Sequence, residues 1–210
     1  MYCILILNSP EDTSLAMPGL LDNYNNLVSR VNDLCREIDA SLTGQITCSA
    51  GCSSCCTAIT IFPVEAAALG TALSRLPPHE AAAIRRHVTG QADGERCPLL
   101  ADHRCLLYTD RPIICRTHGL PVIVTQNDQR QVDCCPRNPI DTTTLTGSHI
   151  IDLDRLNPLL VAINALFLTQ SEAVTPERLT IAMAVLGTSC PDTPTRNTTI
   201  HTPGKKTCSR

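Results

Sequence analysis

The cysteines constrain this chain more than any other feature. The 210 residues contain 13 cysteines, and nine of these lie between positions 48 and 135. This density exceeds ordinary usage but falls below that of a short disulfide-stapled scaffold. The nine clustered residues are Cys48, Cys52, Cys55, Cys56, Cys97, Cys105, Cys115, Cys134 and Cys135. We predict that these nine residues bind metal, and that the isolated cysteines do not; these are Cys3, Cys35, Cys190 and Cys208.

The densest part of the cluster is Cys48-x3-Cys52-x2-Cys55-Cys56. Two thiols separated by two residues in a tight turn can point to one centre, which is why this spacing recurs in zinc and iron–sulfur sites. Adjacent cysteines generally diverge, so one member of a pair can bind one centre while the other binds a second centre or packs. The thiols outnumber the four that one tetrahedral zinc or one cubane cluster uses. The sequence therefore predicts either two centres or one centre with spare thiols.

The N-terminal residues indicate a cytoplasmic protein. The opening apolar segment, 1–7, carries no basic residue and is followed at once by polar residues and Pro10, unlike a secretory signal. No apolar run approaches the roughly 18 residues that cross a bilayer, so we expect no membrane partner. Thiols stay reduced in the cytoplasm, where dense cysteines are more often metal ligands or redox groups than disulfides.

Composition narrows the fold class and the partners. Aromatic residues make up 2% of the chain and Trp is absent, so an apolar core has to be built from aliphatic side chains, most simply on helices. The formal net charge of −3 argues against a nucleic-acid partner, because such proteins usually present a strongly basic face. The partner that the sequence predicts is a metal ion or a metal cluster. A protein partner is a further possibility that the sequence leaves open.

Apolar periodicity predicts mostly helix. Residues with an apolar period of three to four steps run from Leu20 to Leu42, which indicates an amphipathic helix. Further helices are predicted over 64–76, 78–90, 154–169 and 176–186, where prolines and glycines mark several of the ends.

One β-hairpin is predicted in addition to the helices. Two short β-branched segments, 121–125 and 131–133, flank Gln126-Asn127-Asp128, and the second leads directly into Cys134-Cys135. Segment 91–117 is predicted to be loop. The fold class is thus mainly α: a small helical domain over 20–189 around a loop-rich cysteine centre. Residues 1–19 are predicted to be an N-terminal extension and residues 190–210 a disordered tail.

Arginines accompany the clustered cysteines. A buried site made of thiolates is negatively charged and needs compensation. Arg96 and Arg104 are expected to be solvated surface residues. Arg111 and Arg116 bracket Cys115, and we expect their guanidinium groups to donate hydrogen bonds to the site.

The combined pattern resembles the YkgJ-type cysteine-cluster family. The residues that carry the resemblance are Cys48-x3-Cys52-x2-Cys55-Cys56, Cys97-Pro98-Leu99 and Cys105-x2-Tyr108-x2-Arg111-Pro112-x2-Cys115-Arg116-x2-Gly119. The domain of that family is described as zinc- or iron-chelating. The resemblance implies a metal centre and extends the supporting residues to Tyr108. Flagellin lysine N-methylases, which are associated with iron–sulfur binding, are similar through the same kind of cluster.

The cofactor is predicted to be a 4Fe–4S cluster or zinc. Pro98 and Pro136 each follow a cysteine, as a proline follows a ligand in bacterial ferredoxins, which favours iron–sulfur. Zinc is an open alternative, because thiolate-rich closed zinc sites stabilise small loop-rich regions. His118 is a weaker ligand candidate, because it stands alone in a turn.

Three functions follow from these patterns. The first is a metal-binding protein whose cysteine-ligated centre, most simply 4Fe–4S, has a redox or auxiliary role. The second is a zinc-chelating structural or interaction module. The third is a lysine-methylase-like enzyme, for which the sequence names no catalytic residue and contains no Gly-rich loop of the dinucleotide-binding type.

Overall fold

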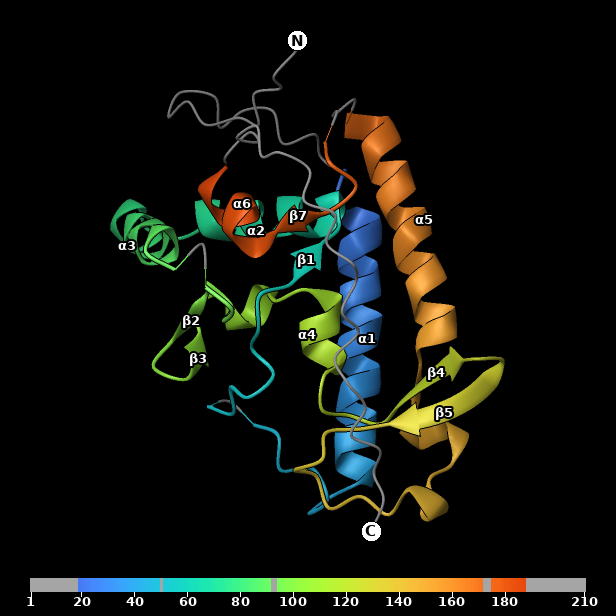
Figure 1. Cartoon of the computed structure of the whole chain (residues 1–210). Coiled ribbons are helices and arrows are strands. Elements are labelled where there is room, and N and C mark those ends of the chain that lie inside the picture. Colours follow the sequence, from blue (N-terminus) through green and yellow to red (C-terminus); the bar gives the residue numbers. More distant parts are fainter. Residues whose placement is uncertain (1–18, 50, 92–93, 172–174, 188–210) are drawn as a thin grey trace.

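The computed structural model describes residues 19–49, 51–91, 94–171 and 175–187. Two long helices, α1 (Asp22–Ser41) and α5 (Leu153–Ser171), lie side by side along one edge of the molecule (Figure 1). The buried residues of α1 repeat at steps of three, four and seven, and are Tyr24, Leu27, Val31 and Ile38. The helices predicted over 20–42 and 154–169 are therefore confirmed.

A second group of helices packs at one end of this pair. It consists of α2 (Pro63–Ser74), α3 (Pro78–Thr89) and α6 (Ile181–Leu186). Pro63 and Pro78 occupy the first positions of their helices, where the missing N–H costs nothing and the fixed φ suits the helix. The predictions over 64–76 and 78–90 are confirmed within about two residues at each end.

The helix predicted over 176–186 is too long at its start. The residues before Ile181 instead form a strand that pairs antiparallel with a strand preceding α2. The two strands are β1 (Thr60–Ile61) and β7 (Leu179–Thr180). The Thr180 hydroxyl accepts the N–H of Met183 at 3.1 Å and so caps α6. A strand of two residues is too short to show an alternating period. The apolar residues of 176–186 therefore predicted a helix over the whole segment.

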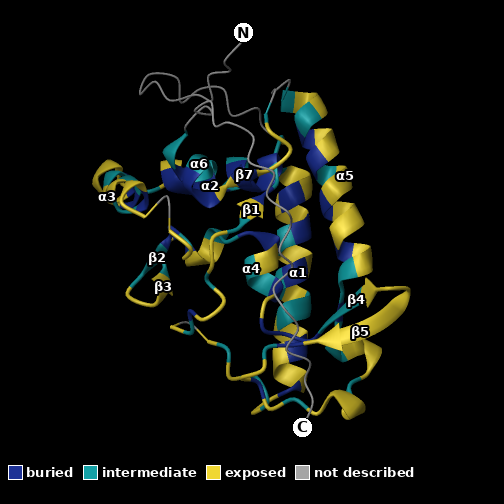
Figure 2. Cartoon of the chain, viewed as in Figure 1, coloured by how far each residue is buried: buried dark blue, intermediate teal, exposed yellow. Residues whose placement is uncertain are grey.

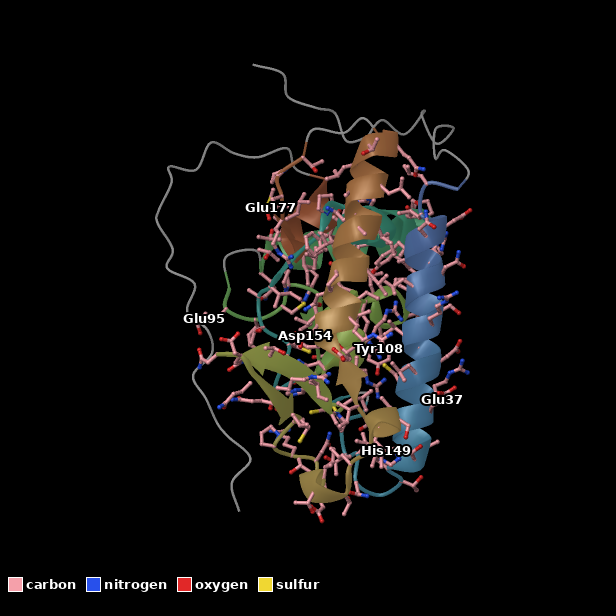
Figure 3. The ribbon with its side chains drawn as sticks, turned by 90° about the vertical axis from the view of Figure 1, so that its right-hand side faces the viewer. Glu37, Glu95, Tyr108, His149, Asp154 and Glu177 are labelled. Carbon is pink, nitrogen blue, oxygen red and sulfur yellow. The ribbon has the colours of Figure 1, made fainter. Side chains whose placement is uncertain are left out.

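The predicted hairpin is present and is extended by a third strand. Strands β4 (Val122–Gln126) and β5 (Gln129–Asp133) pair antiparallel, and β6 (Ile151–Asp152) adds to β4 in parallel. The turn residues Asn127 and Asp128 have φ of 51° and 59°, which suits a two-residue hairpin loop. Two 3₁₀ turns, η2 (Thr142–Thr144) and η3 (Gly147–His149), connect β5 to β6. His149 lies near the lower end of α1, against which η3 packs (Figure 3).

Segment 91–117 is more ordered than the predicted loop. It contains β2 (Leu100–Ala101), β3 (Arg104–Cys105), the 3₁₀ turn η1 (Tyr108–Asp110) and α4 (Ile113–Thr117). Strands β2 and β3 form a second hairpin, whose turn residues Asp102 and His103 have φ of 46° and 62°. These elements are too short to show a period, so the sequence could not reveal them.

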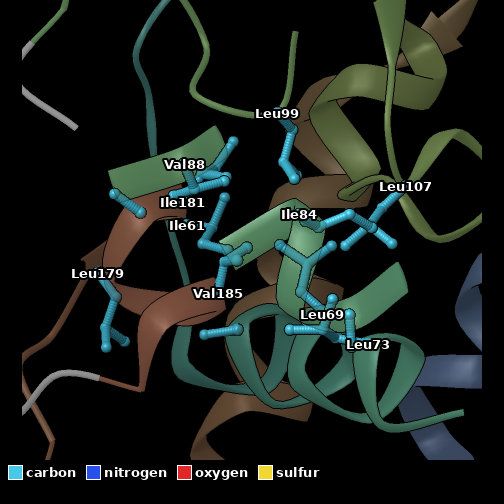
Figure 4. Close-up of a cluster of buried hydrophobic side chains, with 13 residues drawn as sticks. Ile61, Leu69, Leu73, Ile84, Val88, Leu99, Leu107, Leu179, Ile181 and Val185 are labelled. Carbon is cyan, nitrogen blue, oxygen red and sulfur yellow. The ribbon is translucent and has the colours of Figure 1, made fainter. Parts of the chain in front are cut away.

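Two apolar clusters form the interior (Figure 2). The first joins β1, α2, α3, β7 and α6, and its larger members are drawn in Figure 4. The second joins α1, α4 and α5 and includes Leu120 and Ile151. Cys97 and Cys105 pack against the first cluster and Cys35 against the second, so the cysteine region adjoins both.

The architecture agrees with a small domain in which helices predominate and sheets are short. Across the described ranges, the helices fall short of the length and apolarity that a bilayer span requires. The predicted N-terminal extension, except Gly19, and the predicted tail lie outside the described residues. Cys3, Cys190 and Cys208 lie outside them too.

Candidate metal centre

The first cysteine loop is attached to the segment that follows β5. Thr47 donates its N–H to the side-chain oxygen of Asn138 at 2.9 Å. The Asn138 amide donates to the Gly119 carbonyl at 2.6 Å, and the Asn138 N–H donates to the Cys135 carbonyl at 2.9 Å. Asn138 is only 5% exposed, so these bonds are shielded from water. One buried amide thereby brings Cys48 and Cys135 to the same place.

Gly119 lets the two segments approach closely. Its φ is +99°, a conformation that side chains other than glycine's rarely adopt. A Cβ atom placed there would lie 3.0 Å from the Cys48 Sγ. The Cys135 N–H donates to the Gly119 carbonyl at 3.4 Å, so the glycine contacts both cysteines.

A second set of cysteines is arranged by backbone pairing. The Cys97 N–H donates to the Cys56 carbonyl at 3.1 Å, and Thr57 forms a β-bridge with Arg96. Cys105 lies on β3 directly opposite Leu100 of β2. Because Cys97 and Cys105 also pack against the first apolar cluster, their thiols are fixed from the core side.

Cys115 comes from α4, and a buried carboxylate fixes the start of that helix. Glu65 Oε1 accepts the N–H of Ile113 at 3.1 Å, and Oε2 accepts the N–H of Phe62 at 3.0 Å. Glu65 is 3% exposed. It satisfies free N–H groups at the starts of α2 and α4 together, which ties Cys115 to the helical layer.

We name two sets of neighbouring thiols, which adjoin at Cys55 and Cys56. The loop thiols are Cys48, Cys52, Cys55 and Cys135, and the core thiols are Cys56, Cys97, Cys105 and Cys115. Burial raises the pKa of Cys48 to about 11, and the strongest charge effects on it come from the other loop thiols. Burial raises the pKa of Cys115 to about 12, and the strongest charge effects on it come from the other core thiols. Cys55 and Cys56 also affect one another, so the two groups adjoin at this pair.

Cys52 differs from its neighbours. The N–H of Ser54 and the guanidinium of Arg137 hold its pKa below the ordinary value. Arg137 Nη1 lies 3.7 Å from the Cys52 Sγ. Cys52 thus loses its proton more readily than Cys48 and Cys97, since burial raises the pKa of both of these thiols to about 11.

The predicted supporting residues lie beside the core thiols. The Arg111 guanidinium lies over the Tyr108 ring at 3.9 Å, and Arg116 donates to Asn32 at 3.0 Å and to the Thr109 carbonyl at 2.7 Å. Within the described chain, the buried Nε atoms of Arg111 and Arg116 have no hydrogen-bond partner. Two buried cationic donors therefore remain available beside a group of thiols.

Two polar contacts hold the cysteine loop to its surroundings. Arg96 is exposed, as predicted, yet donates to the Ser53 carbonyl at 2.7 Å. The Ser53 hydroxyl is 2.9 Å from His103 Nδ1. These bonds connect the loop between Cys52 and Cys55 to the β2–β3 region.

A cavity of about 810 Å³ adjoins the thiols. Seven of the nine predicted ligands line it: Cys48, Cys52, Cys55, Cys56, Cys97, Cys105 and Cys115. Cys35 and the exposed His118 also line it. Cys134 is 8% exposed and lies in the interior, whereas Cys135 reaches the loop thiols through Gly119.

The residues fit a thiolate-bound metal or cluster in donor type and in charge. Free thiols are Cys35, Cys48, Cys52, Cys55, Cys56, Cys97, Cys105, Cys115 and Cys135. Among the described residues, no three Cys, His, Asp or Glu side chains are already placed as ligands of a single metal ion. The thiols are gathered, and the Nε donors of Arg111 and Arg116 can compensate the charge that their ionisation would create.

Comparison with known proteins supports the cysteine-cluster prediction. Residues 47–143 match the CxxCxxCC family, described as "Putative zinc- or iron-chelating domain". The matched segment spans all nine clustered cysteines, and the family description agrees with the predicted cofactor, an iron–sulfur cluster or zinc. No curated protein and no solved structure matches the chain, so the similarity to flagellin lysine N-methylases stays a prediction.

The sequence assigned no site role to three residues that position the thiols. Glu65 has a local signal, because it is the third residue of a helix that begins with proline. Gly119 stands in the motif that carries the family resemblance, but the motif does not reveal its contact with Cys48. Asn138 has none, since its partners Thr47 and Gly119 are remote in sequence.

Proposed function

We propose that the chain carries a 4Fe–4S cluster in the thiol-lined cavity, with a redox or auxiliary role. The observation that carries the proposal is the cavity itself, which has a volume of about 810 Å³ and is bordered by seven of the nine clustered cysteines. Four thiolates around one zinc converge to Zn–S distances of about 2.3 Å and leave little free volume between them. A cubane cluster keeps its four thiolates farther apart, and the cavity that these cysteines line has room for one.

The surroundings of the core thiols support this assignment. A cluster held by four thiolates carries negative charge and its sulfurs accept hydrogen bonds, which tune its reduction potential. The unpartnered Nε groups of Arg111 and Arg116 are buried cationic donors of the required kind. When bound, the cluster would supply one-electron chemistry, while these arginines would hold its charge and limit access of water.

The dense cysteines support a cytoplasmic location. Thiols are kept reduced in the cytoplasm, where clustered cysteines are more often metal ligands or redox groups than disulfides. We place the metal-binding domain over residues 20–189. In the sequence, α1 precedes the matched segment, and α5 and α6 follow it.

Anaerobic purification followed by metal and sulfide analysis tests the proposal. We expect brown protein with broad visible absorption, together with iron and acid-labile sulfide in equal amounts. Cys115→Ser should lose iron, whereas Cys35→Ser should keep it, since Cys35 lines the same cavity but donates to the Arg116 carbonyl at 3.7 Å. Colourless protein with stoichiometric zinc would replace the cluster by a zinc-chelating module. Folded protein without either metal would refute both.

A further inference from the structure

We propose that the chain holds two separate four-thiolate centres, one bound by the loop thiols and one by the core thiols. This inference deepens the proposed function and rests on it. The ligands of the first centre are Cys48, Cys52, Cys55 and Cys135; those of the second are Cys56, Cys97, Cys105 and Cys115. The two members of the Cys55-Cys56 pair are thereby assigned to different centres. In the Cys134-Cys135 pair, Cys135 is a ligand and Cys134 lies outside both centres.

Geometry separates the loop thiols from the rest. Cys48 and Cys135 meet at Gly119, whose missing side chain leaves room for the Cys48 sulfur. Arg137, two residues beyond Cys135, points its guanidinium back to the Cys52 sulfur at 3.7 Å. The segment 135–138 therefore contacts the beginning of the cysteine loop at both Thr47 and Cys52.

The core thiols converge from a different side. Cys56 is joined to Cys97 through a backbone hydrogen bond of 3.1 Å. Cys97 and Cys105 rest on the first apolar cluster, and Cys115 comes from α4, whose first N–H donates to Glu65 at 3.1 Å. Four chain segments thus supply one thiol each, which is the ligand number of a tetrahedral zinc or a cubane cluster.

Cys55 and Cys56 lie at the boundary between the two groups. Cys55 is exposed and lies in a turn that the Cys56 N–H closes by donating to the Ser53 carbonyl at 3.1 Å. Cys56 follows that turn and is joined to Cys97 through its own carbonyl, so the chain changes direction at this pair and the two thiols can serve two centres. The other adjacent pair is separated by burial, since Cys134 is 8% exposed in the interior whereas Cys135 contacts Gly119 beside Cys48.

Metal counting in paired variants tests the inference. The full-length chain is purified without oxygen, and iron, sulfide and zinc are measured per folded chain, with native mass spectrometry as the second readout. The wild type should hold about eight iron and eight sulfide if both centres are 4Fe–4S. Cys52→Ser with Cys135→Ser should halve the metal, and Cys97→Ser with Cys115→Ser should halve it by removing the other centre.

Two control variants test whether metal loss is specific to the proposed ligands. Cys35→Ser and Cys134→Ser should retain the full metal content, because neither belongs to a group. The loop variant decides the matter if the core variant fails to fold, since the loop thiols lie away from the apolar clusters. Loss of all metal in the soluble loop variant, or no loss, would overturn the two-centre inference while leaving a metal-binding protein. Two zinc ions per chain, halved by the loop variant, would uphold two centres and refute the iron–sulfur assignment instead.

Discussion

The loop thiols and the core thiols are held in place by different means. The core thiols rest on an apolar cluster and on a helix whose start is fixed by Glu65. The loop thiols depend on polar contacts with Asn138 and on the space beside Gly119. Apolar packing is spread over many contacts and survives the loss of one of them. A small network of hydrogen bonds loses its geometry when one bond breaks. The comparison indicates that the core site is largely built by folding and that the loop site needs its metal to stay in place.

Metal removal should have the largest effect and should act unevenly. Structural metal binding to thiolates contributes on the order of 10 kcal/mol to the folded state. Anaerobic chelation should expose backbone amides in 47–57 and 134–138, measured by hydrogen exchange, while α1 and α5 keep their protection. Equal exchange in the metal-bound and metal-free protein would contradict the dependence on metal, and uniform loss across the chain would contradict the difference between the two regions.

Glu65→Gln tests the anchoring of the core thiols. Glutamine has one acceptor oxygen where the carboxylate uses two, so the N–H of either Phe62 or Ile113 loses its partner. A buried unpaired N–H costs about 1–3 kcal/mol, which urea unfolding of the metal-free protein would detect.

Glu37→Gln is the matched control for that variant. Glu37 is exposed on α1, and its replacement should change the free energy of unfolding by less than about 0.5 kcal/mol. Equal stability of the two variants would show that Glu65 does not fix the start of α4.

Gly119→Ala tests the close approach at the loop thiols. The positive φ makes any side chain unfavourable by about 1–2 kcal/mol, and the new Cβ would also meet the Cys48 sulfur at 3.0 Å. We expect reduced stability together with loss of metal from the loop thiols, measured as metal per folded chain.

Gly44→Ala separates the two causes. Gly44 has φ of +81°, and nothing lies within 4 Å of the position its Cβ would take. The Gly44→Ala variant should therefore lose stability because of its positive φ and keep its metal content unchanged. Metal loss in both variants would assign the effect to backbone strain rather than to contact with Cys48.

The dependence of metal affinity on pH should show the smallest difference between the regions. A thiol must release its proton to become a ligand, so affinity rises with pH until the metal-free thiols ionise by themselves. Burial raises the pKa of Cys97 to about 11 and of Cys115 to about 12, whereas the pKa of Cys52 lies below its ordinary value.

Zinc competition titrations from about pH 7 to about pH 10 would measure this difference in variants that keep one thiol group each. The affinity should rise less steeply for the loop thiols than for the core thiols, because Cys52 releases its proton more readily in the metal-free protein. The difference is small, since burial raises the pKa of Cys48, another loop thiol, to about 11. Identical slopes would mean that Arg137 and the N–H of Ser54 do not favour the Cys52 thiolate.

Local sequence determined the helices and the chemical class of the site. The apolar period of α1, the prolines that begin α2 and α3, and the residues of the β4–β5 turn act within a few positions, so they can be read without knowledge of the fold. The cysteine spacing and the arginine pattern around Cys115 likewise predicted a metal-binding class that the family match supports.

The proposed division of the thiols could come only from the tertiary structure. The Thr47–Asn138 bond joins residues 91 positions apart, and the Val64–Asn164 bond joins residues 100 positions apart. Such pairings depend on how helices and strands pack, and no local period encodes them. Two-residue strands such as β2 and β3 form for the same reason: their partner is supplied by the fold, and their own sequence carries too few residues to specify it.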